Sequence, residues 1–324
     1  MNSKKLNDSE NEKLDFNEFN FAKSNKNKIN YKFLIYILFS FLHFIALFII
    51  IYLIKNNIKF EKNIKKEFLD KIQFLNLNII KENSIIYKNQ YNIYNLLSVM
   101  GVMGHKKIRI GRKADGGYIL LEDLKNIKIA YSFGISGEVS FDKELTDKNI
   151  DVYMYDHTIF NLPFENPRFH WKKIGLSGKK NSNNLKILPD LLKENGHTKE
   201  NDLLLKMDIE SHEWEVLENL PLKILNQFKY IVGEFHFSKR KKYNYFYILK
   251  KLQITHQIFH LHCNNCGRII TLNGYKICNL LEISFIRKSG YKFYKDNNKF
   301  PIKGLDFKNC NHKLEITDVL NYYI

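Results

Sequence analysis

The chain has 324 residues, of which 44% are hydrophobic and 14% aromatic, so it can bury a substantial core and is not a disordered polypeptide. Its 51 Lys+Arg outweigh 34 Asp+Glu, giving a net charge of +17, but the lysines are scattered rather than gathered in a basic stripe, and we expect no nucleic-acid partner. Five prolines, 15 glycines and four cysteines exclude collagen-like, proline-rich and disulfide-scaffold classes.

The N-terminal part of the sequence predicts a tail followed by a membrane anchor. Residues 1–30 are polar and rich in Asn, Lys and Glu, which is typical of disorder. Within 31–55, the run from Phe33 to Ile54 carries no formal charge and is long enough to cross a bilayer as one helix, with a buried core helix as the alternative. Lysines flank both ends of the run, so charge does not decide its orientation. We expect a single-pass membrane protein, contacting the membrane through residues 33–54, of type II in the Golgi and secretory pathway.

Residues 56–90 predict a helical stalk that leads to the part of the chain able to carry chemistry. Apolar side chains recur there three or four residues apart, at Ile64, Phe68, Ile72 and Leu75. The seam is too short for a coiled coil, which needs three or four sustained heptads.

Between residues 91 and 324, short β-rich runs alternate with helical runs, which is the pattern of a doubly wound α/β sheet. The expected strands are Lys128–Phe133, Asp151–Tyr155, Phe169–Ile174, Leu203–Met207, Tyr230–Glu234, Gln257–His262 and Leu281–Arg287. The expected helices are Ser140–Lys148, Leu185–Asn195, Glu213–Asn219 and Tyr243–Leu252. The predicted fold is an α/β, doubly wound, Rossmann-like sheet of seven strands, preceded by a single transmembrane helix. Ligands bind beyond the carboxyl ends of such strands, so the residues that follow each strand are the site candidates.

A glycine-containing turn follows the first expected strand and predicts a cofactor loop. Gly134 and Gly137 allow a sharp turn and a close approach of a ligand, and Glu138 follows them. Asp156 ends the second strand about 20 residues later, where an acid can accept the ribose hydroxyls of a nucleotide-like cofactor; a turn or helix cap is the alternative. The third glycine of a dinucleotide fingerprint is missing, and Glu138 would repel a pyrophosphate. The loop therefore favours S-adenosylmethionine, which has no phosphate, over NAD.

Acidic and histidine side chains gather after the later strands. They are Asp208, Glu210, Glu234, His236, His260 and His262. Grouped carboxylates are costly unless a metal, a cation or a polar substrate offsets their repulsion. We take Asp208, His236 and Glu210 as the catalytic candidates, with Asp208 or His236 accepting a hydroxyl proton. We assign no metal ligand, although a divalent metal could bind such a ring, and the histidines could instead satisfy buried backbone groups.

The order of these motifs resembles the FkbM-related methyltransferases, and most closely the methyltransferase-22-type domain of methyltransferase-like, membrane-anchored proteins. The likeness rests on YSFGISGEVSFD, VYMYDHT, LLLKMDIESHEWEVL, IVGEFHF and FHLHCNNCG, and it runs from about Gly111 to Lys288. The upstream segment RIGRKADGGYILLED also resembles this family, and it reads equally as a hairpin with a DGG turn.

The resemblance implies an S-adenosylmethionine-dependent methyltransferase whose acceptor is a hydroxyl. It places Gly134 and Gly137 in the cofactor loop, Asp156 on the ribose, and Asp208 in the DIE motif. The family reads DIEGxE, whereas Ser211 stands here in the place of the glycine. If that position has positive φ, the serine costs about 1 kcal/mol.

The expected function is therefore O-methylation of a glycan or another small polar acceptor. A membrane-tethered, non-catalytic binding module with the same fold is the alternative, motivated by Ser211. Cys263 and Cys266 have the spacing of a zinc knuckle, but no second such pair follows, so we expect isolated thiols, with a structural zinc or a disulfide as alternatives.

Overall fold

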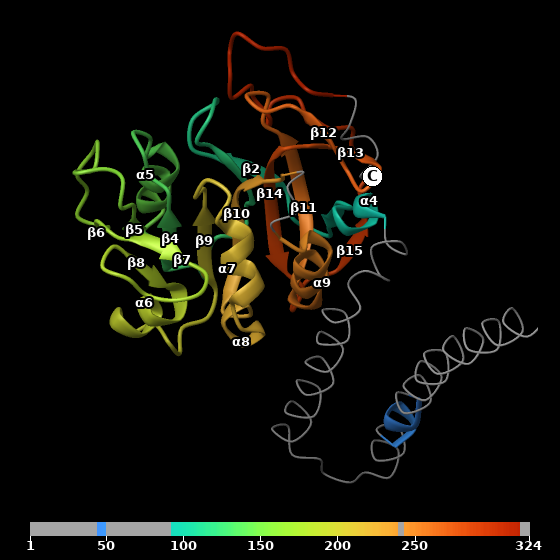
Figure 1. The fold of residues 1–324 in the computed structure, drawn as a ribbon, viewed down its shortest axis with the longest axis horizontal. Helices are drawn as coiled ribbons and strands as arrows, with labels where there is room; N and C mark the ends of the chain where they lie inside the picture. The colour runs from blue at the N-terminus through green and yellow to red at the C-terminus, as the bar shows by residue number, and fades with distance from the viewer. Residues whose placement is uncertain (1–43, 50–91, 239–242, 318–324) are drawn as a thin grey trace, which may run out of the picture. The chain divides into compact units, whose positions relative to one another are not determined.

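The computed structural model describes residues 44–49, 92–238 and 243–317 (Figure 1). Residues 44–49 are helical and belong to one compact unit, and the other described residues belong to a second. No helix within the described ranges is both long and apolar enough to cross a lipid bilayer. We therefore correct two predictions, the transmembrane helix before the sheet and the single-pass location in the secretory pathway, since neither is supported. The predicted tail and stalk lie outside the described residues.

The second unit is built on a mixed α/β arrangement with one seven-stranded sheet. Its strands are β4 (Ile129–Phe133), β5 (Asp151–Tyr155), β6 (Phe169–Lys172), β9 (Leu203–Met207), β10 (Phe228–His236), β11 (His256–Cys263) and β14 (Leu280–Arg287). Their order is β11-β14-β10-β9-β4-β5-β6, which Figure 1 shows from right to left. The five strands from β10 to β6 are parallel, and β14 is antiparallel to both β10 and β11. Each strand of this sheet overlaps one that the sequence predicts.

Alternate side chains of the central strands enter two separate cores, one on each face of the sheet. On β9, Leu203, Leu205 and Met207 belong to one buried cluster, whereas Leu204 belongs to the other. A strand buried on both faces reads as a continuous apolar run, which is what Leu203–Met207 shows apart from one lysine. That lysine, Lys206, is only 6% exposed, and it lines the cavity described below.

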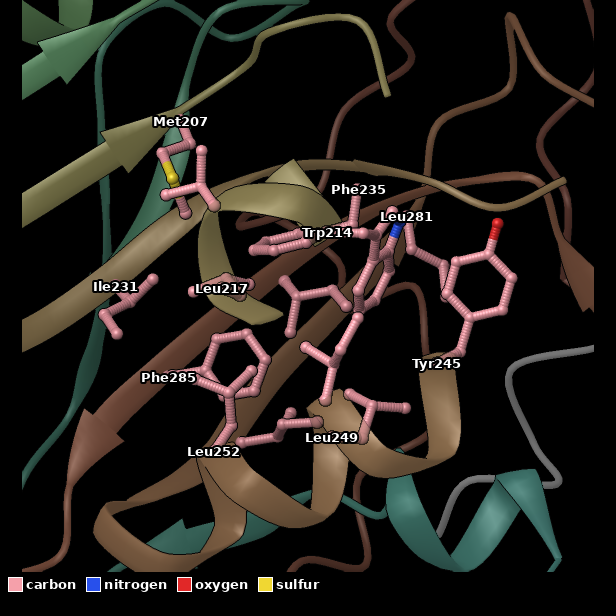
Figure 2. Packing of buried hydrophobic residues seen from close by; sticks show 14 of the residues in the cluster. Met207, Trp214, Leu217, Ile231, Phe235, Tyr245, Leu249, Leu252, Leu281 and Phe285 are labelled. Carbon is pink, nitrogen blue, oxygen red and sulfur yellow. The ribbon is translucent and has the colours of Figure 1, made fainter. Parts of the chain in front are cut away.

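Helices cover both faces of the sheet, as a doubly wound fold requires. They are α4 (Ile93–Leu96), α5 (Ser140–Asp147), α6 (Leu188–Glu194), α7 (Glu213–Asn219), α8 (Leu222–Leu225) and α9 (Tyr245–Thr255). Residues of α5 lie in one core, and residues of the other five lie in the opposite core. In Figure 2, Trp214 of α7 packs beside Tyr245 of α9 and Phe235 of β10, with ring centroids 4.9 and 5.5 Å from that of Trp214.

Four short strand pairs lie outside the sheet, and the sequence indicated only one of them, the hairpin at the DGG segment, as an alternative. They are β1 (Met100–Val102) with β15 (Phe293–Lys295), β2 (Lys107–Ile110) with β3 (Tyr118–Leu121), β7 (Gly175–Ser177) with β8 (Leu185–Ile187), and β12 (Ile269–Leu272) with β13 (Tyr275–Cys278). The expected helix 185–195 is thus split, because its first three residues form β8 and the helix begins next to a proline in its first turn. The DGG segment does form a hairpin, with β2 antiparallel to β3.

The four cysteines form two disulfides, so the expectation of isolated thiols is wrong. Cys263 is bonded to Cys278 and Cys266 to Cys310, across sequence separations of 15 and 44 residues. The longer link fastens the C-terminal segment to the end of β11. In the chain-entropy account, closing a loop of that length stabilises the folded state by about 4 kcal/mol.

Candidate functional site

A cavity of about 640 Å³ lies at the carboxyl ends of the parallel strands, where the strand order reverses. From β4 the chain continues to β5 and β6 on one side of the sheet and returns to β9 and β10 on the other, which makes the β4/β9 edge the switch point where such sheets bind ligands. The predicted site residues that line the cavity are Gly134, Gly137, Glu138, Asp156, Asp208 and Glu210. His236 does not line it, but it contacts Glu210, which does.

Gly134 forms the sharp turn that closes the end of β4 onto β9. Its φ is +75°, and a Cβ atom at this position would lie 1.6 Å from the carbonyl oxygen of Asp208. The N–H of Asp208 donates to the carbonyl of Phe133 at 3.1 Å, and the Lys206 ammonium group donates to the carbonyl of Gly134. Glycine is therefore required here both by the left-handed backbone and by the close approach of the two strand ends.

Gly137 and Glu138 behave differently from Gly134. Gly137 has an ordinary φ and open space where a Cβ would stand, so the chain itself does not demand glycine there. Glu138 accepts a hydrogen bond from the N–H of Ser140 at 2.8 Å, which satisfies a free donor at the start of α5. This hydrogen bond of Glu138 stabilises the start of α5, and the same side chain also lines the cavity.

Asp156 holds the glycine turn in place. Its Oδ2 accepts the N–H groups of Ile135 and Ser136 at 2.9 and 3.0 Å. Its Oδ1 accepts the N–H and the hydroxyl of Thr158 at 2.7 and 2.6 Å. Burial opposes ionisation, but these hydrogen bonds outweigh it and lower the pKa of Asp156, so the carboxylate is charged at neutral pH. A ribose hydroxyl could reach Oδ1 only if the Thr158 hydroxyl rotates away.

The DIE motif forms a strained turn between β9 and α7. Asp208 follows β9 and lies 3.4 Å from the Tyr118 hydroxyl, which donates to its Oδ2. Glu210 and Ser211 both have positive φ, +53° and +80°, a conformation that non-glycine residues rarely adopt. The turn is held by the Glu213 carboxylate, which accepts the N–H of Ile209 at 2.8 Å. Ser211 therefore has the positive φ for which we expected from the sequence a cost of about 1 kcal/mol.

Replacing Ser211 by glycine should stabilise the protein by about 1 kcal/mol, because glycine adopts φ of +80° without the Cβ penalty. Urea unfolding of the full chain would show the gain as a higher midpoint at unchanged slope. The matched control is Ser211→Ala, which keeps the Cβ and should give no gain. If Ser211→Ala stabilises as much as Ser211→Gly, the hydroxyl rather than the backbone causes the strain.

His236 lies at the centre of a carboxylate cluster at the end of β10. Its Nδ1 is 3.3 Å from Glu213, and its Nε2 is 3.3 Å from Glu234 and 3.4 Å from Glu210. The Glu213 side chain is fully buried, whereas that of Glu210 is 88% exposed. The strand is two residues longer at this end than the sequence predicts, since β10 runs to His236 itself.

The charges of this cluster can be assigned from their surroundings. Burial opposes the positive charge of His236, but Glu213, Glu234 and Asp208 raise its pKa to about 9. Burial, reinforced by Asp208, raises the pKa of Glu234 to about 8. Burial also raises the pKa of Asp208, while Lys206 and His236 act in the opposite direction. At neutral pH His236 is therefore a cation and cannot accept a proton, which leaves Asp208 as the better general base.

Two groups of side chains at this edge have the geometry to hold a divalent cation. In one, ligand atoms of Asp208, Glu234 and His236 lie within 4.8 Å of one another, and in the other those of Asp115, Glu234 and Glu282 do. Carboxylate oxygen and imidazole nitrogen suit hard or borderline divalent metals. The charged His236 already offsets part of the repulsion between the carboxylates of the first group.

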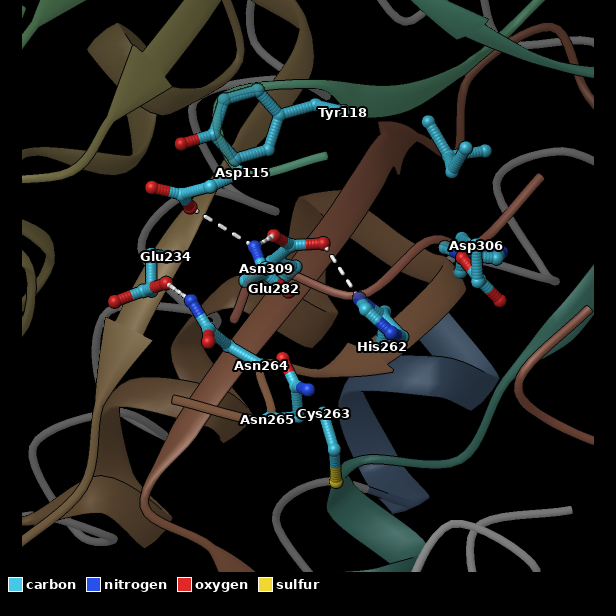
Figure 3. Close-up of polar contacts among 12 residues, drawn as sticks. Asp115, Tyr118, Glu234, His262, Cys263, Asn264, Asn265, Glu282, Asp306 and Asn309 are labelled. Carbon is cyan, nitrogen blue, oxygen red and sulfur yellow. Dashed lines mark hydrogen bonds and ion pairs between the residues drawn. The ribbon is translucent and has the colours of Figure 1, made fainter. Parts of the chain in front are cut away.

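The two later histidines face the C-terminal segment rather than the cavity. His260 is 2.7 Å from Asp306, and His262 contacts Glu282 at 2.9 Å and Glu315 at 3.1 Å. Figure 3 shows the resulting polar layer, in which Asn309 joins Glu282 to Asp115 at the cavity wall. Carboxylates therefore partner both imidazoles, whereas the alternative offered from the sequence was that these histidines satisfy buried backbone groups.

Several cavity residues were not predicted from the sequence. Arg112, Asp115 and Tyr118 come from the β2–β3 hairpin, and Asp142 and Lys206 come from α5 and β9. A lysine inside an otherwise apolar central strand was the available signal for Lys206. Asp142 reads in the sequence as an ordinary acid in the first turn of a helix, so no pattern set it apart.

No known protein family matches this chain, and a search of curated proteins found no similar sequence.

Proposed function

We propose that this protein is an S-adenosylmethionine-dependent methyltransferase that transfers a methyl group to a hydroxyl of a glycan or another small polar acceptor. One observation carries the proposal. The Gly134 turn after β4 and Asp156 after β5 are joined by hydrogen bonds into one wall of a ligand-sized cavity at the switch point, and Asp208, directly after β9, lines the same cavity. The motif resemblance described above supports the same class.

The cavity residues suit a donor that combines an adenosine group with positive charge. Gly137 leaves open space where a side chain would stand, so a ligand could approach the loop backbone. The carboxylates of Glu138, Asp142, Asp156 and Asp208 line the cavity, and they disfavour a pyrophosphate more than a sulfonium. When bound, the donor would supply an activated methyl group.

The protein's own groups would position the acceptor and take its proton. Asp208 would accept the hydroxyl proton as the acceptor oxygen attacks, since burial gives it a higher proton affinity than an exposed carboxylate. The charged His236, held by Glu213 at 3.3 Å, would keep the surrounding acids oriented. The side chains of Asp115, Tyr118 and Glu210 line the same cavity and offer polar contacts of the kind that hydroxyl-rich acceptors use.

The first test is calorimetric titration of the purified full chain with S-adenosylmethionine. We expect saturable binding and a rise in the unfolding temperature, because a ligand that binds only the folded state stabilises it. Absence of both at millimolar ligand would contradict the proposal.

A second test separates an enzyme from a binding module. Incubating the chain with methyl-labelled donor and pools of glycans, lipids and proteins should label a hydroxyl-bearing acceptor. Donor binding without transfer to any pool would favour the non-catalytic alternative.

A further inference from the structure

We propose that Asp142 and Lys206 bind the amino-acid end of the donor, with Asp142 accepting hydrogen bonds from its ammonium group and Lys206 donating to its carboxylate. This inference rests on the proposed function, because it assigns recognition of one part of the same ligand. It concerns residues that neither the motif resemblance nor the catalytic scheme uses.

The first observation is a buried carboxylate oxygen without a hydrogen bond. Asp142 lies in the first turn of α5, is 1% exposed and lines the cavity. Its Oδ1 is buried and makes no hydrogen bond of normal geometry to a described residue, although the nearby Ser132 hydroxyl helps to lower the pKa of Asp142. Leaving a buried charged oxygen without a hydrogen bond is unfavourable, so a donor on a ligand at this place would stabilise the bound complex. Burial raises the pKa of Asp142 to about 6, against the pull of Lys206, so the group is still ionised at neutral pH.

The second observation is a buried cation on the same wall. Lys206 is 6% exposed and lines the cavity. Its ammonium group donates to the carbonyls of Phe133 and Gly134, which leaves one of its three N–H donors for a ligand. Ser132 lies opposite Lys206 in the β4–β9 register, and its buried hydroxyl makes no hydrogen bond of normal geometry to a described residue but lies close enough to Asp142 to influence its pKa.

Asp142 and Lys206 do not form an ion pair with each other. The structure describes both side chains, and their charged atoms do not come within 4.0 Å of each other. The positive charge of Lys206 nevertheless lowers the pKa of Asp142 through space. One anion and one cation that share a cavity without pairing are complementary to a ligand with both charges. An α-amino acid group carries an ammonium and a carboxylate on neighbouring carbons, whereas adenosine carries neither.

The position of the pair also fits the division of the ligand into two halves. Asp156 follows β5 and Lys206 lies on β9, on opposite sides of β4, so they are separated by two strand spacings, roughly 10 Å. The adenosine half is assigned to the Asp156 side of the glycine turn. Lys206 lies two residues before Asp208 and its charge acts on the Asp208 carboxylate, so the amino-acid end would lie near the proposed base.

The test compares two ligands on the full chain by calorimetry. S-adenosylhomocysteine carries the amino-acid end, and 5′-methylthioadenosine has the adenosine half without it. Asp142→Asn should weaken binding of S-adenosylhomocysteine about 10- to 100-fold, the range for a lost charge-assisted hydrogen bond, and leave 5′-methylthioadenosine within 2-fold. The matched control is Asp147→Asn, which removes an exposed acid from the same helix, paired there with Lys143, and should change neither affinity.

Each outcome decides the matter. Unchanged binding of S-adenosylhomocysteine to Asp142→Asn overturns the assignment, and so does an equal loss for both ligands, which would show that Asp142 only supports the loop. If Asp142→Asn does not fold, the wild type answers the question, because it should bind S-adenosylhomocysteine at least 10-fold more tightly than 5′-methylthioadenosine; equal affinities overturn the inference. If the wild type binds neither ligand, the proposed function itself fails.

Discussion

Replacing Gly134 by alanine should destabilise the protein by about 3 kcal/mol or more, or prevent it from folding. The new Cβ would lie 1.6 Å from the Asp208 carbonyl oxygen, and φ of +75° adds the penalty of a left-handed alanine. Relief would require β4 and β9 to separate at their carboxyl ends, where the cavity begins. Chemical unfolding of the full chain measures the loss, and donor binding should disappear with it.

The matched control for this change is Gly137→Ala, three residues along the same loop. Gly137 has an ordinary φ and no atom within 4 Å of the added methyl group, so its unfolding midpoint should stay close to that of the wild type. An unaltered midpoint for Gly134→Ala would show that the turn is not packed as described.

Replacing Asp208 by asparagine should lower kcat about 10²- to 10⁴-fold, which is the usual contribution of a positioned general base. Asparagine keeps the size of the side chain but cannot accept the acceptor's proton. Donor affinity should change little, because the proposed donor contacts lie on Asp156, Asp142 and Lys206. Initial rates over a range of acceptor concentrations measure kcat, and calorimetry measures donor affinity.

The pH profile distinguishes a base from a residue that only supports the fold. The rate of the wild type should rise with pH as Asp208 loses its proton, and this rise should be absent in Asp208→Asn. Glu165→Gln, which neutralises an exposed loop acid, is the control and should keep both the rate and its pH dependence. A variant Asp208→Asn with an unchanged kcat would remove Asp208 from the mechanism.

The seven-stranded sheet could be predicted because its strands are short, β-rich runs that alternate along the chain with runs of helical periodicity. The bounds of β5, β9 and α7 agree residue for residue with the expected ranges, since each is a compact run between strong breaks. The meeting of Gly134, Asp156 and Asp208 also followed, because parallel strands end on one edge.

Contacts between distant parts of the chain could not be predicted. Neither the Cys266–Cys310 disulfide nor the contact of His262 with Glu315 leaves any periodic pattern in a single sequence. The protonation of His236 depends on Glu213 and Glu234, which reach it from α7 and from its own strand, so a sequence reading could not choose between His236 and Asp208 as the base. The apolar run at 33–54 shows the opposite error, where local hydrophobicity alone led to a predicted membrane helix, and no helix among the described residues is long and apolar enough to match it.

The pairing of β1 with β15 limits how far the folded part of this protein can be shortened. Met100 and Gly101 align with Lys295 and Tyr294, and the Met103 N–H donates to the carbonyl of Lys292 at 2.9 Å. A recombinant version that starts at Lys107 would lack β1, the hydrogen-bonding neighbour of β15. The unpaired edge of β15 could then pair with a strand of another molecule and cause self-association. Crystallisation or screening work should therefore keep both Met100–Val102 and Phe293–Lys295.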